Sequence, residues 1–145
     1  MPITNSKGKY SFNLIKKLSN DGIKLNITAI TTVEQIVKLK NHLNKKTPCV
    51  ISVFAGRIAD TGRNPSNFIK KAIQIFKSFK KAEILWASTR ELYNIIQANK
   101  LGCHIITVPP NLLKKINLFN KNLKKYSLET VKDFYIDAKK SKYKI

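Results

Sequence analysis

Short apolar segments alternate with amphipathic segments along most of this chain of 145 residues. Four runs rich in β-branched residues are typical of strands buried on both faces of a sheet: residues 23–30, 49–55, 83–87 and 104–108. Apolar residues recur at helical spacing in residues 12–19, 33–43, 68–79, 92–98, 112–116 and 128–141. This alternation predicts an α/β fold with parallel strands.

Residues that start or stop helices stand at the ends of these segments. Gly22 and Gly102 follow predicted helices and precede predicted strands, as glycines at helix C-termini do. Thr32 with Gln35, and Ser88 with Glu91, have the spacing of capping boxes that open the helices after two strands. The last predicted helix carries its apolar side chains on one side, at Val131, Phe134, Tyr135 and Ala138.

The pattern fits two kinds of parallel sheet, an open doubly wound sheet and part of a (β/α)8 barrel. A complete barrel takes about 250 residues, so this chain would supply only about half of one. No linker or low-complexity stretch interrupts the sequence. We therefore expect a single domain over residues 1–145, with about four strand–helix units and a further helix.

Composition changes this picture little. The net charge of +20 raises the question of a nucleic-acid partner. Paired lysines occur on nearly every predicted helix, which favours solvated helix faces over one nucleic-acid surface. No apolar run approaches the roughly 20 residues that span a bilayer, and Cys49 and Cys103 are too few for a disulfide framework. These features predict a cytoplasmic protein with core cysteines and no membrane partner.

Candidate chemistry lies where the predicted strands end, because parallel α/β folds collect function there. Polar residues at these places form one set: Asn26, Thr28, Ser52, Arg57, Ser88 and Arg90. A single Ser or Thr in a strand is often only a buried hydroxyl, and Ser88 is equally well explained as a helix N-cap.

The arginines are more specific, since there are only three among 28 basic residues and all follow strands. The planar guanidinium is suited to phosphate, and a helix start at Arg90 would favour an anion. Arg57, Ser88 and Arg90 therefore predict a phosphate site. The scattered carboxylates offer no pair for glycoside hydrolysis, and no metal-ligand spacing, P-loop or dinucleotide fingerprint occurs, so we expect neither a metal nor a cofactor.

Five segments, in order, resemble the transaldolase and fructose-6-phosphate aldolase family. ISVFAGRIADTG (residues 51–62) is similar to its "SPFVGRIxDxG" segment, LNITAI (25–30) to its fifth strand and LWASTR (85–90) to its "GASFR" strand. LGCHIITV (101–108) resembles "AGCDxxTxxP", and MPIT (1–4) resembles the segment after the fourth strand. The resemblance implies the C-terminal half of a (β/α)8 barrel.

It also implies an activity, the transfer of a dihydroxyacetone unit between sugar phosphates through a lysine Schiff base, as in the pentose phosphate pathway. The roles implied are contact with the Schiff-base region for Asn26, water positioning for Thr28 and substrate binding for Ser52. Arg57, Ser88 and Arg90 would hold the phosphate of fructose 6-phosphate or a similar ligand. Phe54 stands where transaldolases tend to carry Phe and the fructose-phosphate aldolases Tyr.

The family pattern "VK(I/V)PVT" would put the Schiff-base lysine one residue before Met1, and the first strand's Asp and third strand's Glu are also absent. Lys7 and Lys9 follow in a loop, where an amine in water stays protonated. We therefore expect this chain alone to be inactive, with an N-terminal half-barrel or a second copy as partner. The alternatives are a non-catalytic sugar-phosphate-binding remnant and a basic nucleic-acid-binding protein.

Overall fold

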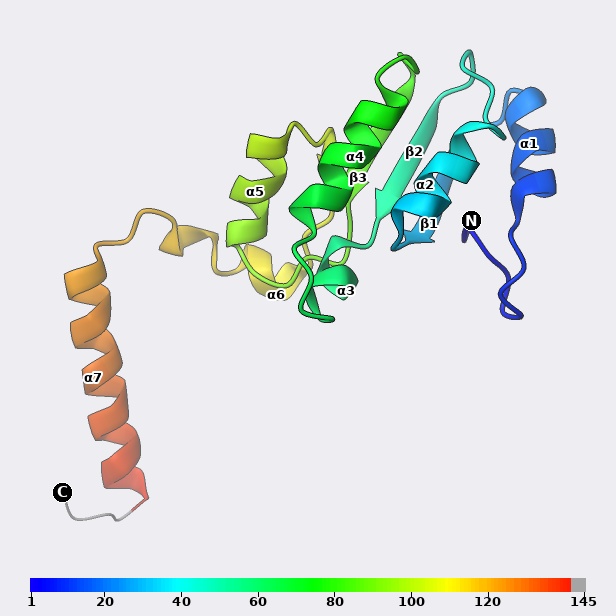
Figure 1. Cartoon of the computed structure of the whole chain (residues 1–145). Coiled ribbons are helices and arrows are strands. Elements are labelled where there is room, and N and C mark those ends of the chain that lie inside the picture. Colours follow the sequence, from blue (N-terminus) through cyan, green and yellow to red (C-terminus); the bar gives the residue numbers. More distant parts are fainter. Residues whose placement is uncertain (142–145) are drawn as a thin grey trace. The chain divides into compact units, whose positions relative to one another are not determined.

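Four parallel strands form one sheet in the computed structural model, which describes residues 1–141 (Figure 1). The strands are β1 (Leu25–Ile30), β2 (Cys49–Val53), β3 (Ala82–Trp86) and β4 (Ile105–Ile106). Their order across the sheet is their order in the sequence, and every neighbouring pair is parallel. All four predicted strands are confirmed, although β4 is only two residues long.

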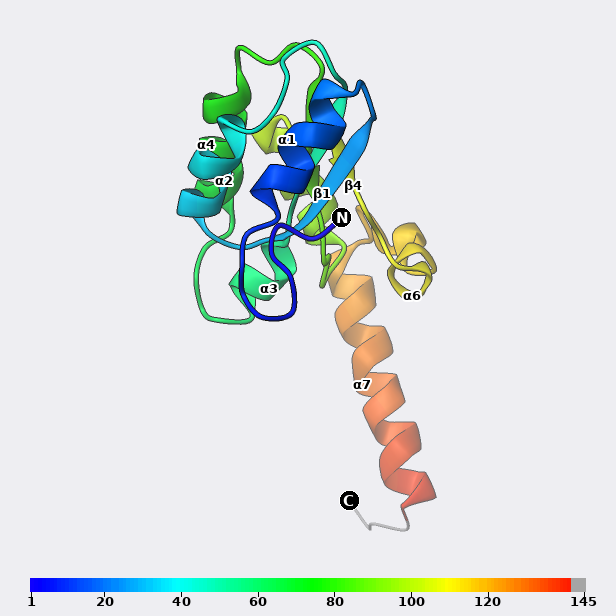
Figure 2. The ribbon, with the colours of Figure 1, turned by 90° about the vertical axis from the view of Figure 1, so that its right-hand side faces the viewer.

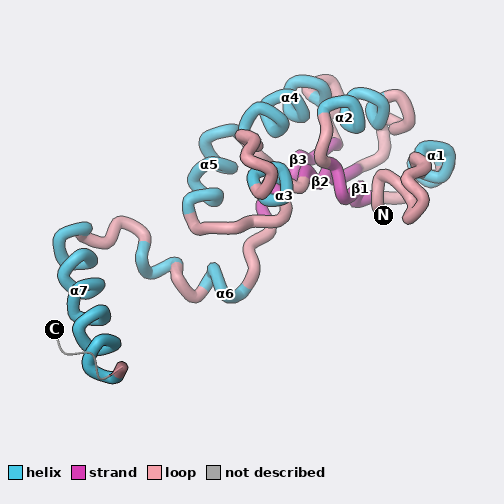
Figure 3. Tube along the Cα trace, turned by 60° about the horizontal axis from the view of Figure 1, so that its bottom comes forward, coloured by secondary structure: helices cyan, strands magenta, loops and turns pink. Residues whose placement is uncertain are grey.

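The helices that follow the strands cover one face of this sheet. The main helices of this part of the chain are α1 (Phe12–Asn20), α2 (Val33–Lys40), α4 (Ser66–Phe76) and α5 (Tyr93–Leu101), and the short ones are α3 (Ala55–Ala59) and α6 (Pro110–Leu113). Figure 3 shows α2, α4 and α5 along one side of the strands. Their apolar side chains share a core with Ile27, Ile51 and Trp86.

This arrangement decides between the two sheet types that the sequence leaves open. A doubly wound sheet reverses its strand order and carries helices on both faces. Here the order is β1-β2-β3-β4 without reversal, and the strand side chains that meet the helices all come from the same face. The fold is therefore part of a (β/α)8 barrel, with the helices outside.

Burial on both faces holds for the middle strands and not for the outer ones. All five residues of β2 are buried, whereas Asn26 in β1 is exposed and both residues of β4 are only half-buried. The prediction was wrong for β1 and β4. Within residues 1–141, β4 has a strand neighbour on one side only, and Asn26 faces away from the helix-covered core.

Residues 1–3 lie beside β1 (Figure 2). The Met1 carbonyl accepts a hydrogen bond from the Thr28 amide at 2.9 Å, and the Ile3 amide donates to the Thr28 carbonyl at 3.0 Å. Pro2 and Thr28 form a parallel bridge. This segment thus lies along the outer edge of β1, and its pairing with Thr28 was not predicted from the sequence.

A β-bulge interrupts β1. Ile27 pairs with Ile51 and Ile30 pairs with Val53, so β1 has one residue more than β2 between these pairs. Ala29 takes up the extra length with φ of 61°, a left-handed conformation that is costly for alanine. The bulge lets both Ile27 and Ile30 enter the core, where each is fully buried.

Most helix signals are confirmed. Gly22 and Gly102 have φ near 79° and 78° just after helices, and Thr32 and Gln35 form both hydrogen bonds of a capping box. Helix α3 was not predicted, because five residues are too few to show helical spacing.

The chain from Lys114 onward is a separate unit, described here by itself. It holds a 3-10 turn (Ile116–Leu118) and α7 (Leu123–Lys140), so the region predicted as helix 112–116 is split between α6 and this turn. Helix α7 begins earlier than expected because the Asn122 side chain accepts from the Lys125 amide at 3.1 Å, capping the helix. The single domain over residues 1–145 stays a prediction. None of the helices in residues 1–141 combines the length and apolarity required to cross a bilayer.

Candidate functional site

A hollow of about 400 Å³ lies on the face of the sheet opposite the helix-covered core. We call it the inner-face hollow. Its lining residues are Asn26, Thr28, Ser52, Phe54, Arg57, Leu85, Ala87, Ser88 and Thr107. They include every residue predicted for the site except Arg90, which lines a neighbouring hollow together with Ser88.

Strand geometry explains why these residues meet. Successive side chains of a strand point to opposite faces, so residues two apart share a face. Asn26 and Thr28 in β1, and Leu85 and Ala87 at the end of β3, are such pairs. Because Ser52 in β2 is paired in register with Leu85, the strands bring polar groups to one place on the inner face.

A hydrogen bond joins the polar side chains of β1 and β2. The Ser52 hydroxyl, which is 2% exposed, donates to Oδ1 of Asn26 at 2.7 Å. This bond fixes the orientation of the Asn26 side-chain amide. Its Nδ2 group, a hydrogen-bond donor, stays available to other partners. The pair can therefore offer oriented hydrogen bonds to hydroxyl groups of a ligand.

Gly56 brings Arg57 next to Ser88. A Cβ atom on Gly56 would lie 1.6 Å from the Ser88 carbonyl oxygen, so only glycine fits between α3 and the segment after β3. The Gly56 amide donates to the Ala87 carbonyl at 3.3 Å. Ser88 itself has φ of 65°, a left-handed conformation that is costly for a residue other than glycine. Strain of this kind is frequent at functional sites.

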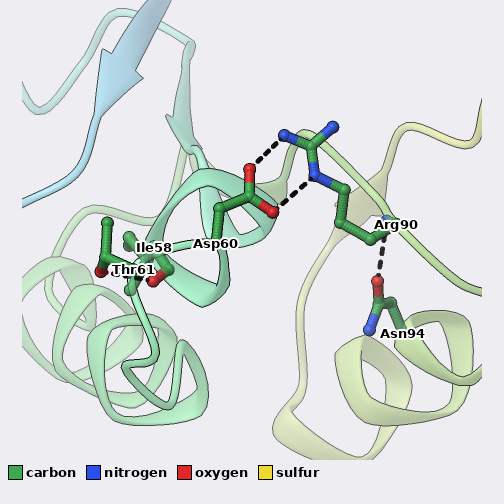
Figure 4. Close-up of polar contacts among 5 residues, drawn as sticks. All are labelled: Ile58, Asp60, Thr61, Arg90 and Asn94. Atoms are coloured by element: carbon green, nitrogen blue, oxygen red, sulfur yellow. Dashed lines mark hydrogen bonds and ion pairs between the residues drawn. The ribbon is translucent and has the colours of Figure 1, made fainter.

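Two predictions about Ser88 and Arg90 are wrong. Helix α5 begins at Tyr93, so Ser88 is not its N-cap, Ser88 and Glu91 form no capping box, and Arg90 is not in its first turn. The Oδ1 of Asn94 accepts from the amides of Arg90 at 3.0 Å (Figure 4) and of Glu91 at 3.2 Å, which both precede the helix. Leu92, the N-cap residue of α5, forms no side-chain capping hydrogen bond.

Arg90 forms an ion pair with Asp60, from the end of α3 (Figure 4). Its Nε donates to Oδ1 at 3.1 Å and its Nη2 to Oδ2 at 2.5 Å, a two-point contact. The hydrogen bond from Arg90 lowers the pKa of Asp60, with a smaller contribution from the charge of Arg57, and the same bond raises the pKa of Arg90. Nothing in the sequence pattern indicated this pair.

The loop that carries Arg90 is fixed on its other side as well. The buried Thr89 hydroxyl donates to the Thr107 carbonyl at 2.6 Å, which ties the loop to the end of β4. Thr107, Leu85 and Ala87 line the hollow although they were not predicted for the site. For Thr107 a signal existed, because it stands at a strand end, as Ser52 and Ser88 do.

Within residues 1–141, this hollow has neither a lysine in its lining nor a metal-binding cluster. Of the residues described, 1–141, no lysine belongs to its lining, and Lys7 and Lys9 are exposed in the N-terminal loop. The same residues contain no group of three or more His, Cys, Asp or Glu side chains placed to hold a metal ion. Cys49 is buried and Cys103 half-buried, both with free thiols.

Comparison with known proteins agrees with the fold and with the segments named above. The family model for transaldolase/fructose-6-phosphate aldolase matches residues 2–145. A probable transaldolase of Nitrosopumilus maritimus is 34% identical over 103 residues, 70% of this chain and 45% of the relative. A probable transaldolase of Caldicellulosiruptor saccharolyticus is 36% identical over 104 residues, which are 70% of this chain and 46% of the relative.

A probable transaldolase of Methanococcus maripaludis is 31% identical over 116 residues, which are 79% of this chain and 51% of the relative. This chain thus spans about half the length of the curated relatives it matches. Since the family match covers nearly all of the chain, the protein belongs to the transaldolase/fructose-6-phosphate aldolase family.

Proposed function

We propose that the inner-face hollow binds a ketose phosphate, such as fructose 6-phosphate, as the phosphate-binding half of a transaldolase-type site. One observation carries the proposal: the hollow combines Arg57 and Ser88 with the hydrogen-bonded pair of Asn26 and Ser52. A sugar phosphate needs both kinds of group, a cation with hydrogen-bond donors for its phosphate and neutral polar groups for its hydroxyls.

The proposed roles follow the family pattern. Arg57 and Ser88 hold the phosphate, and Arg90 assists through Nη1, which the Asp60 contact leaves over. Asn26 and Ser52 bind substrate hydroxyls near the reacting carbon, Thr28 positions the water that hydrolyses the Schiff base, and Phe54 covers the sugar.

The reaction proposed for the complete site is the transfer of a dihydroxyacetone unit. A lysine amine adds to the ketose carbonyl and loses water to form a Schiff base, retro-aldol cleavage releases an aldose phosphate, and the retained unit adds to an acceptor aldose phosphate. Because the lining described above contains no lysine, the amine is proposed to come from a complementing half-barrel facing this hollow. We also propose that the protein acts in the cytoplasm, in the metabolism of sugar phosphates.

Calorimetric titration of the 145-residue chain with fructose 6-phosphate tests the binding step. Arg57→Ala is expected to weaken binding about tenfold, since it removes hydrogen bonds between charged groups. Lys16→Ala is the matched control, because Lys16 is an exposed cation on α1 outside the lining of the hollow. Equal affinity for fructose and fructose 6-phosphate, or equal loss in both variants, would contradict the proposal.

Borohydride reduction in the presence of fructose 6-phosphate, followed by mass spectrometry, tests where the amine comes from. No lysine of the 145-residue chain is expected to carry an adduct. An adduct on Lys7 or Lys9 would show that the chain supplies its own amine, and the complementing half-barrel would then be abandoned.

A further inference from the structure

Arg57 and Arg63 border a second hollow, to which the family pattern assigns no role. This hollow has a volume of about 500 Å³, and its polar lining consists of Thr31, Thr32, Arg57, Thr61 and Arg63. Ile58 and Phe68 complete it. Arg57 lines both this hollow and the inner-face hollow, so the two adjoin at one side chain.

The turn after α3 directs Arg63 back toward this hollow. Gly62 has φ of 75°, and its amide donates to the Ala59 carbonyl at 2.9 Å, which reverses the chain directly before Arg63. Nη1 of Arg63 then donates to the Thr61 hydroxyl oxygen at 2.9 Å. The Thr61 hydroxyl donates in turn to the Ile58 carbonyl at 2.7 Å. The guanidinium of Arg63 is therefore held by its own turn, with most of its N–H groups left over.

Carboxylates do not neutralise these two arginines. Over residues 1–141, the ion pairs of the structure include neither Arg57 nor Arg63. Asp60 lies near Arg57, but both of its oxygens accept from Arg90. Glu34, in the first turn of α2, pairs with Lys38. Two guanidinium groups thus border one concave surface and leave it with positive potential.

Three amides at the start of α2 are already bonded within the chain. The Thr32 hydroxyl accepts from the Gln35 amide at 3.1 Å, and the Gln35 side chain accepts from the amides of Thr31 and Thr32. The capping box and its neighbour bond therefore occupy the amides of Thr31, Thr32 and Gln35. Recognition in this hollow rests on the arginines.

We propose that the Arg57–Arg63 hollow is a second oxyanion site, which takes a phosphate group at Arg63 and shares Arg57 with the inner-face hollow. Guanidinium groups bind phosphate through paired hydrogen bonds, and two of them around a concave surface supply both the charge and the donors. Because Arg57 borders both hollows, phosphate bound here competes for Arg57 with the proposed ketose phosphate, whereas Arg63 belongs to this hollow alone.

Site-resolved titration of the ¹⁵N-labelled 145-residue chain with inorganic phosphate tests this proposal. Amide signals of Thr61, Gly62 and Arg63 are expected to shift together and to saturate. In Arg63→Gln the phosphate affinity at these amides is expected to fall about tenfold, whereas shifts of Ser88 and Arg90 remain. The spectrum of the variant itself reports whether the fold is kept, and Arg63→Lys serves as a second variant if Gln disturbs the turn.

Lys16→Ala removes one exposed charge elsewhere and is expected to leave the Thr61–Arg63 shifts unchanged. An equal loss of affinity in Lys16→Ala and Arg63→Gln would mean general attraction to a basic protein and would overturn the proposal. Absence of saturable shifts at residues 61–63 would overturn it as well. The proposed function fails separately, by absence of shifts at Ser88 and Arg90 with fructose 6-phosphate.

Discussion

Replacement of Gly56 by alanine is expected to displace α3 from the segment after β3 and so to damage both stability and phosphate binding. The Cβ atom would lie 1.6 Å from the Ser88 carbonyl oxygen and 2.7 Å from its carbonyl carbon. Carbon and oxygen atoms in contact are normally about 3.3 Å apart. The two backbones would therefore separate, and the 3.3 Å hydrogen bond from the Gly56 amide to the Ala87 carbonyl would break.

The expected loss of stability is about 2–4 kcal/mol, from roughly 1–3 kcal/mol for overpacking and about 1 kcal/mol for the lost hydrogen bond. For a chain of this size the melting temperature would fall by roughly 6–16 °C. The direction of the change in stability is informative. Gly56 lies in a helix, where replacement of glycine by alanine otherwise raises the stability by about 0.5–1 kcal/mol.

Urea unfolding followed by the fluorescence of Trp86, the one tryptophan and 1% exposed, measures this loss. Gly102→Ala is the matched control, since Gly102 has φ of 78° and open space around it, so that alanine costs only about 1 kcal/mol of conformational strain. A Gly56→Ala protein as stable as the wild type, with unchanged affinity for fructose 6-phosphate, would refute the close approach of Gly56 to Ser88.

Three further predictions concern Arg90, Ser88 and the thiols. Because Arg90 lowers the pKa of Asp60, the stabilisation from this pair is present at neutral pH and is lost as the pH falls through the lowered pKa. The stability difference between wild type and Asp60→Asn, measured by urea unfolding, should be constant from pH 7 to 5 and vanish well below pH 4. Ser88→Gly should raise the unfolding free energy by about 1 kcal/mol by relieving the left-handed backbone, yet weaken fructose 6-phosphate binding in calorimetry; lower stability would contradict the strain. Burial raises the pKa of Cys49 and of Cys103 to about 11. At pH 8 both thiols should therefore react slowly with a disulfide reagent until urea unfolds the chain. Fast reaction of Cys49 in the native protein would contradict this prediction.

Strand periodicity explains why most of the site could be predicted. Asn26 and Thr28 are two residues apart in β1, and Ser52 is two residues beyond Val50, the partner of Asn26, so one face of the parallel sheet brings the three together. The family segments added Phe54, and Arg57 stood out because arginine is rare in this chain. The structure places all of these in one hollow, while their chemical roles remain part of the proposed function.

Prediction failed where side chains far apart in sequence compete for the same groups. Ser88 is of a residue type that often caps helices, but its backbone is left-handed and α5 begins only at Tyr93. Arg90 was expected at a helix start and is instead held by Asp60, thirty residues earlier. Local spacing contains no information on which of two distant elements will approach a given residue.

By itself, the sequence determined the alternation of strands and helices, the positions that face the core, the family, and most of the residues around the inner-face hollow. These depend on periodicities of two and 3.6 residues and on short segments, which are local properties of the chain. Only the tertiary structure decided that α2, α4 and α5 cover one face of the sheet, that Gly56 lets α3 approach Ser88, that Asp60 holds Arg90, and that Arg63 borders a hollow with Arg57. Those features arise from packing between elements, where the sheet and its connections set the distances between residues that are remote along the chain.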